Sequence, residues 1–330
     1  RVGMGQQLLE IQNPLLEIEQ YSGEKQLALH DLRSLVNRPV FQGPGGASLI
    51  GTYMRDDLQR TLVQSLNENT LRLGRRLSGI EQVAGKVLVR FAKVTEATGA
   101  EKDTEEHEFD LLIGADGIRS DTRRLLWGPF SPRFTKFQVV YVVSNKSSRA
   151  HPHRVRQSYQ PGALWMSASA GPESNRRDIC ALAYRRPSLD AAPFDWLTGH
   201  ASADLTAALD RFNAPDEVRQ IVRVSSEPGG GRLYDWPIYY QEPLRGWSKG
   251  HVALLGDSAH ATSPFVGQGA NQAILDSYSL ATKLQSGMSV SDALAAYEKA
   301  RFRETARIIK MSEMIGKIET MRPPLSLARD

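Results

Sequence analysis

The segment from His251 to Asp276 constrains the fold of this chain more than any other. It opens with the apolar run His251–Gly256, which predicts a short buried strand. A glycine-containing loop follows, and then a helix that we predict over Ala270–Gln285. In an open α/β sheet, ligands bind outside the carboxyl ends of the strands, which is where Asp257 would lie. The segment therefore predicts an α/β protein with a ligand site after this strand.

The residues after this strand suit the polar and anionic parts of a ligand. Gly256 predicts a close backbone approach, and the Asp257 carboxylate can accept a hydrogen bond from a sugar-like hydroxyl. Gly267–Gly269 would open a helix whose unpaired first N–H groups favour an anion. A reduced flavin ring, negatively charged on its pyrimidine side, is such an anion. A plain strand–turn–helix connection is the alternative, but Pro264, Asn271 and Asp276 in the same register make it the weaker interpretation.

Apolar periodicity and turn residues predict the remaining elements. Helices are expected over Gly5–Glu19, from Arg55 or Asp56 onward, over much of Leu189–Val222 and over Val290–Ile318. Strands are expected over Thr70–Leu73, Gly79–Gln82, Lys86–Ala92 and Phe109–Gly114, with a charged turn over Thr98–His107. The stretch Arg133–Tyr184 alternates β-rich segments with turn residues, which is typical of an antiparallel sheet. Together the elements indicate an α/β protein with a second sheet inserted.

Composition excludes several classes of function. The net charge is +4 without a long basic tail, which argues against a nucleic-acid partner. No run approaches the roughly 20 apolar residues that cross a bilayer, so no membrane span is expected. The single cysteine, Cys180, excludes an internal disulfide and indicates a small buried core residue in a reducing, cytoplasmic protein. His151 and His153 are too few ligands for a metal site, and we assign no metal.

The segment around Asp257 resembles the second flavin-contacting motif of class A FAD-dependent monooxygenases. These enzymes share the p-hydroxybenzoate hydroxylase fold and include zeaxanthin epoxidase and salicylate hydroxylase-type enzymes. The resemblance implies that Asp257 bonds the ribityl chain and that the loop of Pro264, Phe265 and Gly267 faces the flavin. It implies no dedicated catalytic acid–base pair. The cofactor-binding residues implied by this motif are Gly256, Asp257, Pro264, Gly267, Gln268, Gly269, Ala270 and Asn271.

Two further segments are similar to parts of the same family. Asp110–Arg123 resembles its Asp-Gly motif, which implies that Asp116 and Gly117 contact FAD. Taken by itself, this segment is a strand that turns sharply at Asp-Gly, and Arg123 just beyond it suits the polar parts of a dinucleotide. Arg55 resembles the family's helix-opening arginine, whose guanidinium lies against the FAD.

One family motif does not occur in this sequence. The Gly-x-Gly-x-x-Gly turn that cradles the FAD pyrophosphate is missing, as is the acidic residue that would hold the adenosine ribose. We therefore expect about forty to fifty residues, the size of one βαβ unit, to precede Arg1 in the natural protein. If they are absent, FAD would lose its pyrophosphate site.

The resemblance implies a fold and a division into domains. The expected fold is a Rossmann-like FAD-binding domain of the glutathione reductase type, lacking its first βαβ unit, with an inserted antiparallel-sheet substrate domain and a C-terminal helix. The expected FAD-binding domain comprises residues 1–20, 50–128 and 235–288. The β-rich substrate domain comprises residues 21–49 and 129–234, and the C-terminal helical segment comprises residues 289–330.

The function implied is that of an FAD-dependent monooxygenase, either a hydroxylase or an epoxidase. It would use NADPH or NADH and O2 to insert one oxygen atom into a small organic substrate, aromatic or isoprenoid, through a flavin hydroperoxide. A monomer or homodimer is expected. Two alternatives stay open: a flavin reductase or dehydrogenase of the same fold without oxygen transfer, and a non-catalytic relic that has lost the first FAD unit.

Overall fold

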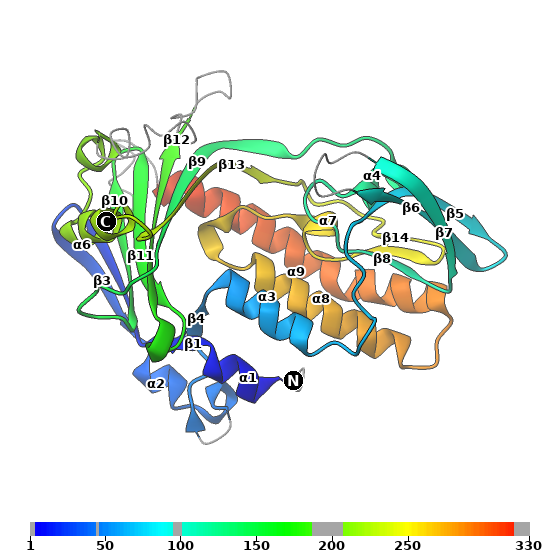
Figure 1. Ribbon diagram of the computed structural model, residues 1–330, viewed down its shortest axis with the longest axis horizontal. Coiled ribbons are helices and arrows are strands. Elements are labelled where there is room, and N and C mark those ends of the chain that lie inside the picture. The colour runs from blue at the N-terminus through cyan, green and yellow to red at the C-terminus, as the bar shows by residue number, and fades with distance from the viewer. Residues whose placement is uncertain (1–3, 44–45, 95–100, 187–206, 320–330) are drawn as a thin grey trace. The chain divides into compact units, whose positions relative to one another are not determined.

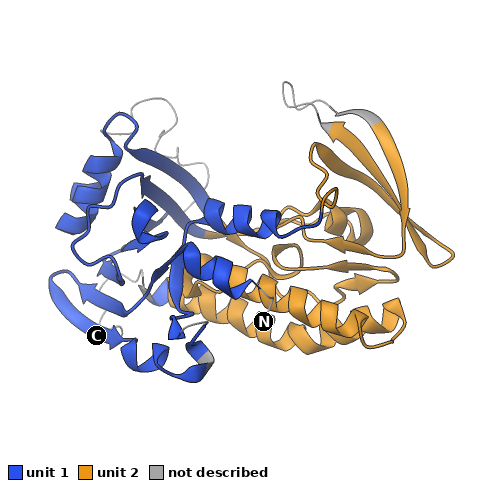
Figure 2. Cartoon of the chain, turned by 60° about the horizontal axis from the view of Figure 1, so that its bottom comes forward, with its two compact units in different colours: residues 1–67, 136–237, 317–330 blue, residues 68–135, 238–316 orange. Residues whose placement is uncertain are grey.

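The computed structural model of the chain (Figure 1) describes residues 4–43, 46–94, 101–186 and 207–319. The chain forms two compact units (Figure 2). Unit 1 comprises residues 1–67, 136–237 and 317–330, and unit 2 comprises residues 68–135 and 238–316. Within the described ranges, no helix has both the length and the apolar character that a membrane span requires.

Unit 1 is built around a seven-stranded sheet with the order β13-β9-β12-β11-β10-β2-β3. Strands β9, β12, β11 and β10 pair antiparallel in succession, which confirms the antiparallel sheet predicted over Arg133–Tyr184. Strand β2 pairs parallel with β10 and antiparallel with β3. The bounds are β2 Glu17–Ser22, β3 Lys25–Asp31, β9 Arg133–Ser144, β10 Arg154–Gln160, β11 Ala163–Ala170, β12 Arg177–Arg185 and β13 Gly231–Tyr240.

Shorter elements complete unit 1. They are α1 Gly5–Glu10, β1 Gln12–Pro14, α2 Arg33–Val36, η1 Pro39–Phe41, β4 Gly51–Tyr53, α3 Arg55–Gln64, η3 Glu173–Asn175 and α6 Asp216–Ser225. Helix α6 packs Val218 and Ile221 into a core with Trp165 and Leu182 of the sheet. Cys180 lies in the same core, where burial raises the pKa of its thiol. The prediction that this cysteine is a small core residue is confirmed.

Unit 2 contains two three-stranded sheets. In one, β15 Val252–Leu254 pairs parallel with β8 Leu112–Gly114 and antiparallel with β14 Ser248–Lys249. The other is antiparallel and has the order β5-β6-β7. The remaining bounds are β5 Arg75–Val83, β6 Lys86–Val94, β7 Glu101–Phe109, α4 Asp121–Trp127, α7 Asp257–His260, η4 Pro264–Val266, α8 Gly269–Leu284 and α9 Val290–Glu319.

Helices α8 and α9 run side by side in unit 2 (Figures 1 and 2). Their facing sides contribute Leu280, Leu294 and Tyr297 to a core that also holds Leu254 and Trp247. The predictions of helices from Arg55, over Ala270–Gln285 and over Val290–Ile318 are confirmed. So is the strand predicted within His251–Gly256. The predicted helical stretch Leu189–Val222 falls partly outside the described residues, and its described part contains helical residues 207–211 and most of α6.

Four local predictions were wrong. The helix expected over Gly5–Glu19 ends at Glu10, because the following residues pair as β1 with β4 and as β2 with β10, far away in sequence. Thr70–Leu73 has no strand partner and is irregular. The described part of the turn expected over Thr98–His107 is extended, because it pairs with β6. The strand expected over Phe109–Gly114 is split, since Phe109 ends β7 and β8 begins at Leu112.

Candidate functional site

The loop after β15 turns at Gly256. This residue has φ 62° and ψ −136°, a backbone conformation that is rare for residues with a side chain. A Cβ atom added there would lie 3.1 Å from the Cβ of Ala273 on α8. Glycine therefore lets the loop turn closely against α8, as the sequence predicted.

Asp257 is the first residue of α7 and stands at the carboxyl end of β15. Its side chain is accessible to solvent, and it forms no hydrogen bond or ion pair with any residue that the structure describes. Crowding by protein atoms nevertheless raises the pKa of its carboxyl, while the nearby His260 partly opposes the rise. An accessible, partly desolvated and unpaired carboxyl is suited to accept hydrogen bonds from a hydroxylated ligand.

The predicted flavin-facing loop follows. Pro264 begins the turn η4, and Gly267 adopts the left-handed conformation with φ 61°. A Cβ added at Gly267 would meet no atom within 4 Å, so open space lies beside its backbone. Pro264 and Gly267 are exposed. Phe265 is partly buried and packs against α9, where a Cβ at Gly316 would overlap its ring.

Helix α8 begins at Gly269, directly after this loop. Gln268 occupies its N-cap position, and no side chain caps the helix by hydrogen bonding. Ala270 and Asn271 in the first turn are exposed. The first N–H groups of a 16-residue helix are thus available to a ligand, and their partial positive charge favours an anion there.

The Asp-Gly motif lies beside this loop in unit 2. Ser258 donates a hydrogen bond to the Gly114 carbonyl (2.5 Å), and the Leu255 N–H donates to the same oxygen (2.9 Å). Because β8 and β15 are parallel, the two motifs follow the same edge of the sheet. Asp116 accepts hydrogen bonds from the Ser120 hydroxyl (2.5 Å) and the Thr122 N–H (2.9 Å). Its carboxylate therefore braces the start of α4.

Gly117 and Arg123 complete that motif in different ways. Gly117 has φ 79°, and its open side meets no atom within 4 Å, so its backbone is approachable. Arg123 is buried, donates to Gln241 and lies 4.2 Å from the centre of the Phe130 ring. Burial also lowers the pKa of its guanidinium. Arg123 therefore braces the interior of unit 2, and the sequence-based expectation that it suits a dinucleotide is not supported by its contacts.

Arg55 opens α3 in unit 1, as predicted, and its side chain is exposed. No hydrogen bond or ion pair of its guanidinium to another described residue is present. Its place in an FAD site stays a prediction.

A buried polar network behind the Gly256 loop escaped the sequence analysis. The Asp276 carboxylate accepts hydrogen bonds from the Gly256 N–H (3.0 Å), from His260 Nε2 (2.5 Å) and from Arg301 Nε (2.8 Å). The His260 ring also packs on Trp247, with 5.1 Å between ring centres. Asp276 was placed in the motif from the sequence, but its buried partners were not predicted. These contacts give His260 a structural role in the network.

The pieces of the site fit a flavin nucleotide in their chemistry. The unpaired Asp257 carboxyl matches a polyhydroxylated chain, and the uncapped start of α8 matches a ring that carries negative charge. Among the described residues, no group of three or more histidine, cysteine, aspartate or glutamate side chains could hold a metal ion. A sequence model of a protein family, described as FAD binding domain, matches residues 44–312.

The chain belongs to this family of FAD-binding domains. It is 27% identical over 288 residues to an aurachin C monooxygenase/isomerase of Stigmatella aurantiaca, covering 83% of this chain and 65% of the relative. It is also 27% identical over 297 residues to a chloroplastic zeaxanthin epoxidase of an Oncidium hybrid cultivar, covering 86% of this chain and 41% of the relative. The chain thus spans less than two thirds of the length of these relatives.

The fold of this FAD-binding family member matches solved structures over nearly its whole length. The structure of HpxO of Klebsiella pneumoniae with FAD and uric acid superposes with a TM-score of 0.78 at 22% sequence identity, covering 99% of this chain and 77% of HpxO. These matches confirm the predicted family, the predicted fold and FAD as the cofactor of the family.

Proposed function

We propose that this chain binds FAD at the loop after β15 and forms part of a monooxygenase. The enzyme would use NADPH or NADH and O2 to insert one oxygen atom into a small aromatic or isoprenoid substrate. The observation that carries the proposal is the unpaired Asp257 carboxyl beside the uncapped start of α8. The names of the relatives, a monooxygenase/isomerase and an epoxidase, support oxygen transfer.

In this proposal each part of the loop has a separate role. Asp257 accepts hydrogen bonds from the hydroxyls of the ribityl chain. The first N–H groups of α8 stabilise negative charge on the flavin. The Pro264 ring gives the flavin site an apolar wall that excludes water. The open space beside the Gly267 backbone leaves room for the substrate. FAD, when bound, supplies the redox chemistry with the nicotinamide and O2.

The residues of this loop and its supporting network supply binding and orientation rather than proton transfer. Asp276 is paired with His260 and Arg301, and the Ser258 hydroxyl is bonded to Gly114. Neither is available as a base or a nucleophile. The proposal therefore assigns no dedicated acid–base pair to the reaction. The substrate-binding role expected for residues 129–234 stays a prediction.

Titration with FAD tests the binding half of the proposal. We expect Asp257→Ala to weaken FAD binding about 10- to 100-fold, because a hydrogen bond to a charged group contributes about 1.5–3 kcal/mol. Flavin fluorescence and isothermal titration calorimetry would measure this. Asp292→Ala, at an exposed position of the same unit, is the matched control and should bind as the parent does. Equal affinity in Asp257→Ala and the parent protein would contradict the assignment.

Oxygen transfer is tested separately from binding. With a panel of phenols and isoprenoids, the FAD-loaded protein should consume NAD(P)H and O2 together and place 18O from labelled O2 in the product. NAD(P)H consumption without a labelled product would favour the flavin reductase alternative. FAD binding with no turnover of any kind would favour the non-catalytic alternative.

A further inference from the structure

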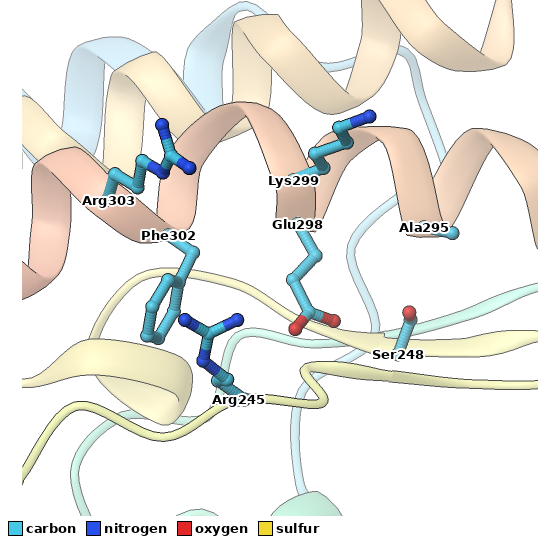
Figure 3. Close-up of a pocket in the computed structure, with 7 residues that line it drawn as sticks. All are labelled: Arg245, Ser248, Ala295, Glu298, Lys299, Phe302 and Arg303. Carbon is cyan, nitrogen blue, oxygen red and sulfur yellow. The ribbon is translucent and has the colours of Figure 1, made fainter.

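A second pocket lies in unit 2 and shares no residue with the proposed flavin site. It has a volume of about 560 Å3, within the range of small-molecule sites. Figure 3 shows Phe302 and Glu298 extending from helix α9 toward Arg245 in the loop before β14, whereas Lys299 and Arg303 extend from α9 away from that loop. The residues that line it are Arg245, Ser248, Ala295, Glu298, Lys299, Phe302 and Arg303. The five residues from α9 follow the spacing of one helix face.

The charges of this pocket are not balanced within it. Arg245, Lys299 and Arg303 are exposed, and no hydrogen bond or ion pair joins any of them to another described residue. The one acidic residue, Glu298, accepts hydrogen bonds from the N–H groups of Gly246 (2.6 Å) and Trp247 (2.8 Å). Both of its oxygens therefore hold the loop. Three cations and one carboxylate leave a net charge of 3 − 1 = +2 in the pocket.

The aromatic ring of Phe302 forms part of the pocket lining. The Arg245 guanidinium lies 4.7 Å from the centre of the Phe302 ring, in cation–π geometry. The Phe302 ring in turn packs edge-on against Trp247, with 6.1 Å between ring centres. These contacts fix the ring and restrain the guanidinium that lies over it, so the pocket offers the flat face of a guanidinium to a planar ligand.

From this combination we propose that the pocket binds a nucleoside monophosphate or a closely similar aromatic phosphate ester. A phosphate monoester carries about −1.5 to −2 charges at pH 7, which matches the net charge of +2. Arginine guanidinium groups suit the geometry of phosphate oxygens, and a lysine adds a point charge. The planar base stacks on the Arg245 guanidinium that lies over Phe302, and the phosphate binds Lys299 and Arg303, which are one helical turn apart on α9.

Titration of the FAD-loaded full chain with adenosine 5′-monophosphate tests this site, with isothermal titration calorimetry as the readout. The parent protein should show saturable binding that weakens as NaCl rises from about 0.05 to about 0.5 M. The double variant Lys299→Gln/Arg303→Gln should bind at least tenfold more weakly, since it loses two charge-assisted contacts. Arg307→Gln, exposed on the same helix but outside the pocket, is the matched control and should leave the affinity unchanged.

Further measurements test the contribution of the base, the folding of the variants and the identity of the site. Ribose 5-phosphate, which has the phosphate but no base, should bind several-fold more weakly than adenosine 5′-monophosphate, because it lacks the base that stacks on the Arg245 guanidinium. Unchanged melting temperatures show that the variants are folded. The proposal is overturned if the parent does not bind adenosine 5′-monophosphate at about 5 mM, or if the double variant binds it equally well. It is also overturned if binding is lost in Asp257→Ala alone, since the nucleotide would then occupy the flavin site.

Discussion

Asp276 is the residue on which the geometry of the proposed flavin loop depends. It is fully buried on α8 and holds Gly256, the residue before Asp257, by a hydrogen bond to its N–H. Burial alone would raise the pKa of the Asp276 carboxyl, but the hydrogen bonds and charges of His260 and Arg301 keep it below its ordinary value. The carboxylate is therefore ionised at neutral pH, and Arg301 is its buried counter-ion.

Replacing this carboxylate leaves a buried cation without its main partner. We expect Asp276→Asn to lower the free energy of unfolding by about 3–5 kcal/mol, the usual effect of breaking a buried ion pair. Urea unfolding followed by circular dichroism measures the change. Glu106→Gln, at an exposed position on β7, should change stability by less than about 0.5 kcal/mol, because this side chain forms no hydrogen bond or ion pair with another described residue. Similar stabilities of the two variants would mean that the network contributes nothing.

At the scale of helices and strands, the sequence predicts an element best where the pattern of apolar residues within that segment is sufficient to identify it. Helices α8 and α9 were found because their apolar residues repeat at helical spacing, and strand β15 was found because it is a short continuous apolar run. The segments β1 and β2 were missed because their partners, β4 and β10, are distant in the sequence. Strand β7 was missed because its many charged residues suggest a turn, although it pairs with the preceding strand β6. The same distinction between local pattern and distant contacts applies to the candidate site. The loop from Gly256 to Asn271 could be predicted from its residue types, whereas the partners of Asp276 lie 16 and 25 residues away and depend on packing.

The turn between β15 and α8 can be tested through its glycine. We expect Gly256→Ala to lower the free energy of unfolding by about 1–3 kcal/mol, because its backbone conformation disfavours a Cβ. FAD affinity should fall as well, because the new methyl group would press on Ala273 and displace the neighbouring Asp257. Thermal unfolding and flavin titration measure both effects. Gly287→Ala is the control: φ there is 79° with no atom within 4 Å, so only the backbone cost of about 1 kcal/mol applies and FAD binding is retained.

On the scale of the whole molecule, each compact unit has its own hydrophobic core. Leu182 belongs to the core of unit 1 and Leu254 to that of unit 2, and both are buried. The proposed flavin loop and the Asp-Gly motif both lie in unit 2. Loss of packing in the two cores should therefore have different consequences for cofactor binding.

This difference gives a matched pair of variants. Leu182→Ala and Leu254→Ala should each lower the free energy of unfolding by about 2–5 kcal/mol, since each leaves a cavity in a packed core. Under conditions where both proteins are folded, only Leu254→Ala should weaken FAD binding, because Leu254 lies two residues before Gly256. Chemical unfolding and flavin titration of the same samples make the comparison. An equal loss of FAD affinity in Leu182→Ala would show that the cofactor site depends on the core of unit 1.

The burial of Cys180 has a practical consequence for experiments on this chain. It is the only cysteine in the sequence and is 1% exposed, in the middle of β12, with a thiol that resists ionisation. Maleimide dyes and spin labels react with an accessible thiolate, so the parent chain should remain unlabelled while folded. A cysteine added at any chosen surface position would then carry the probe alone, and no background substitution is needed before spectroscopic work begins.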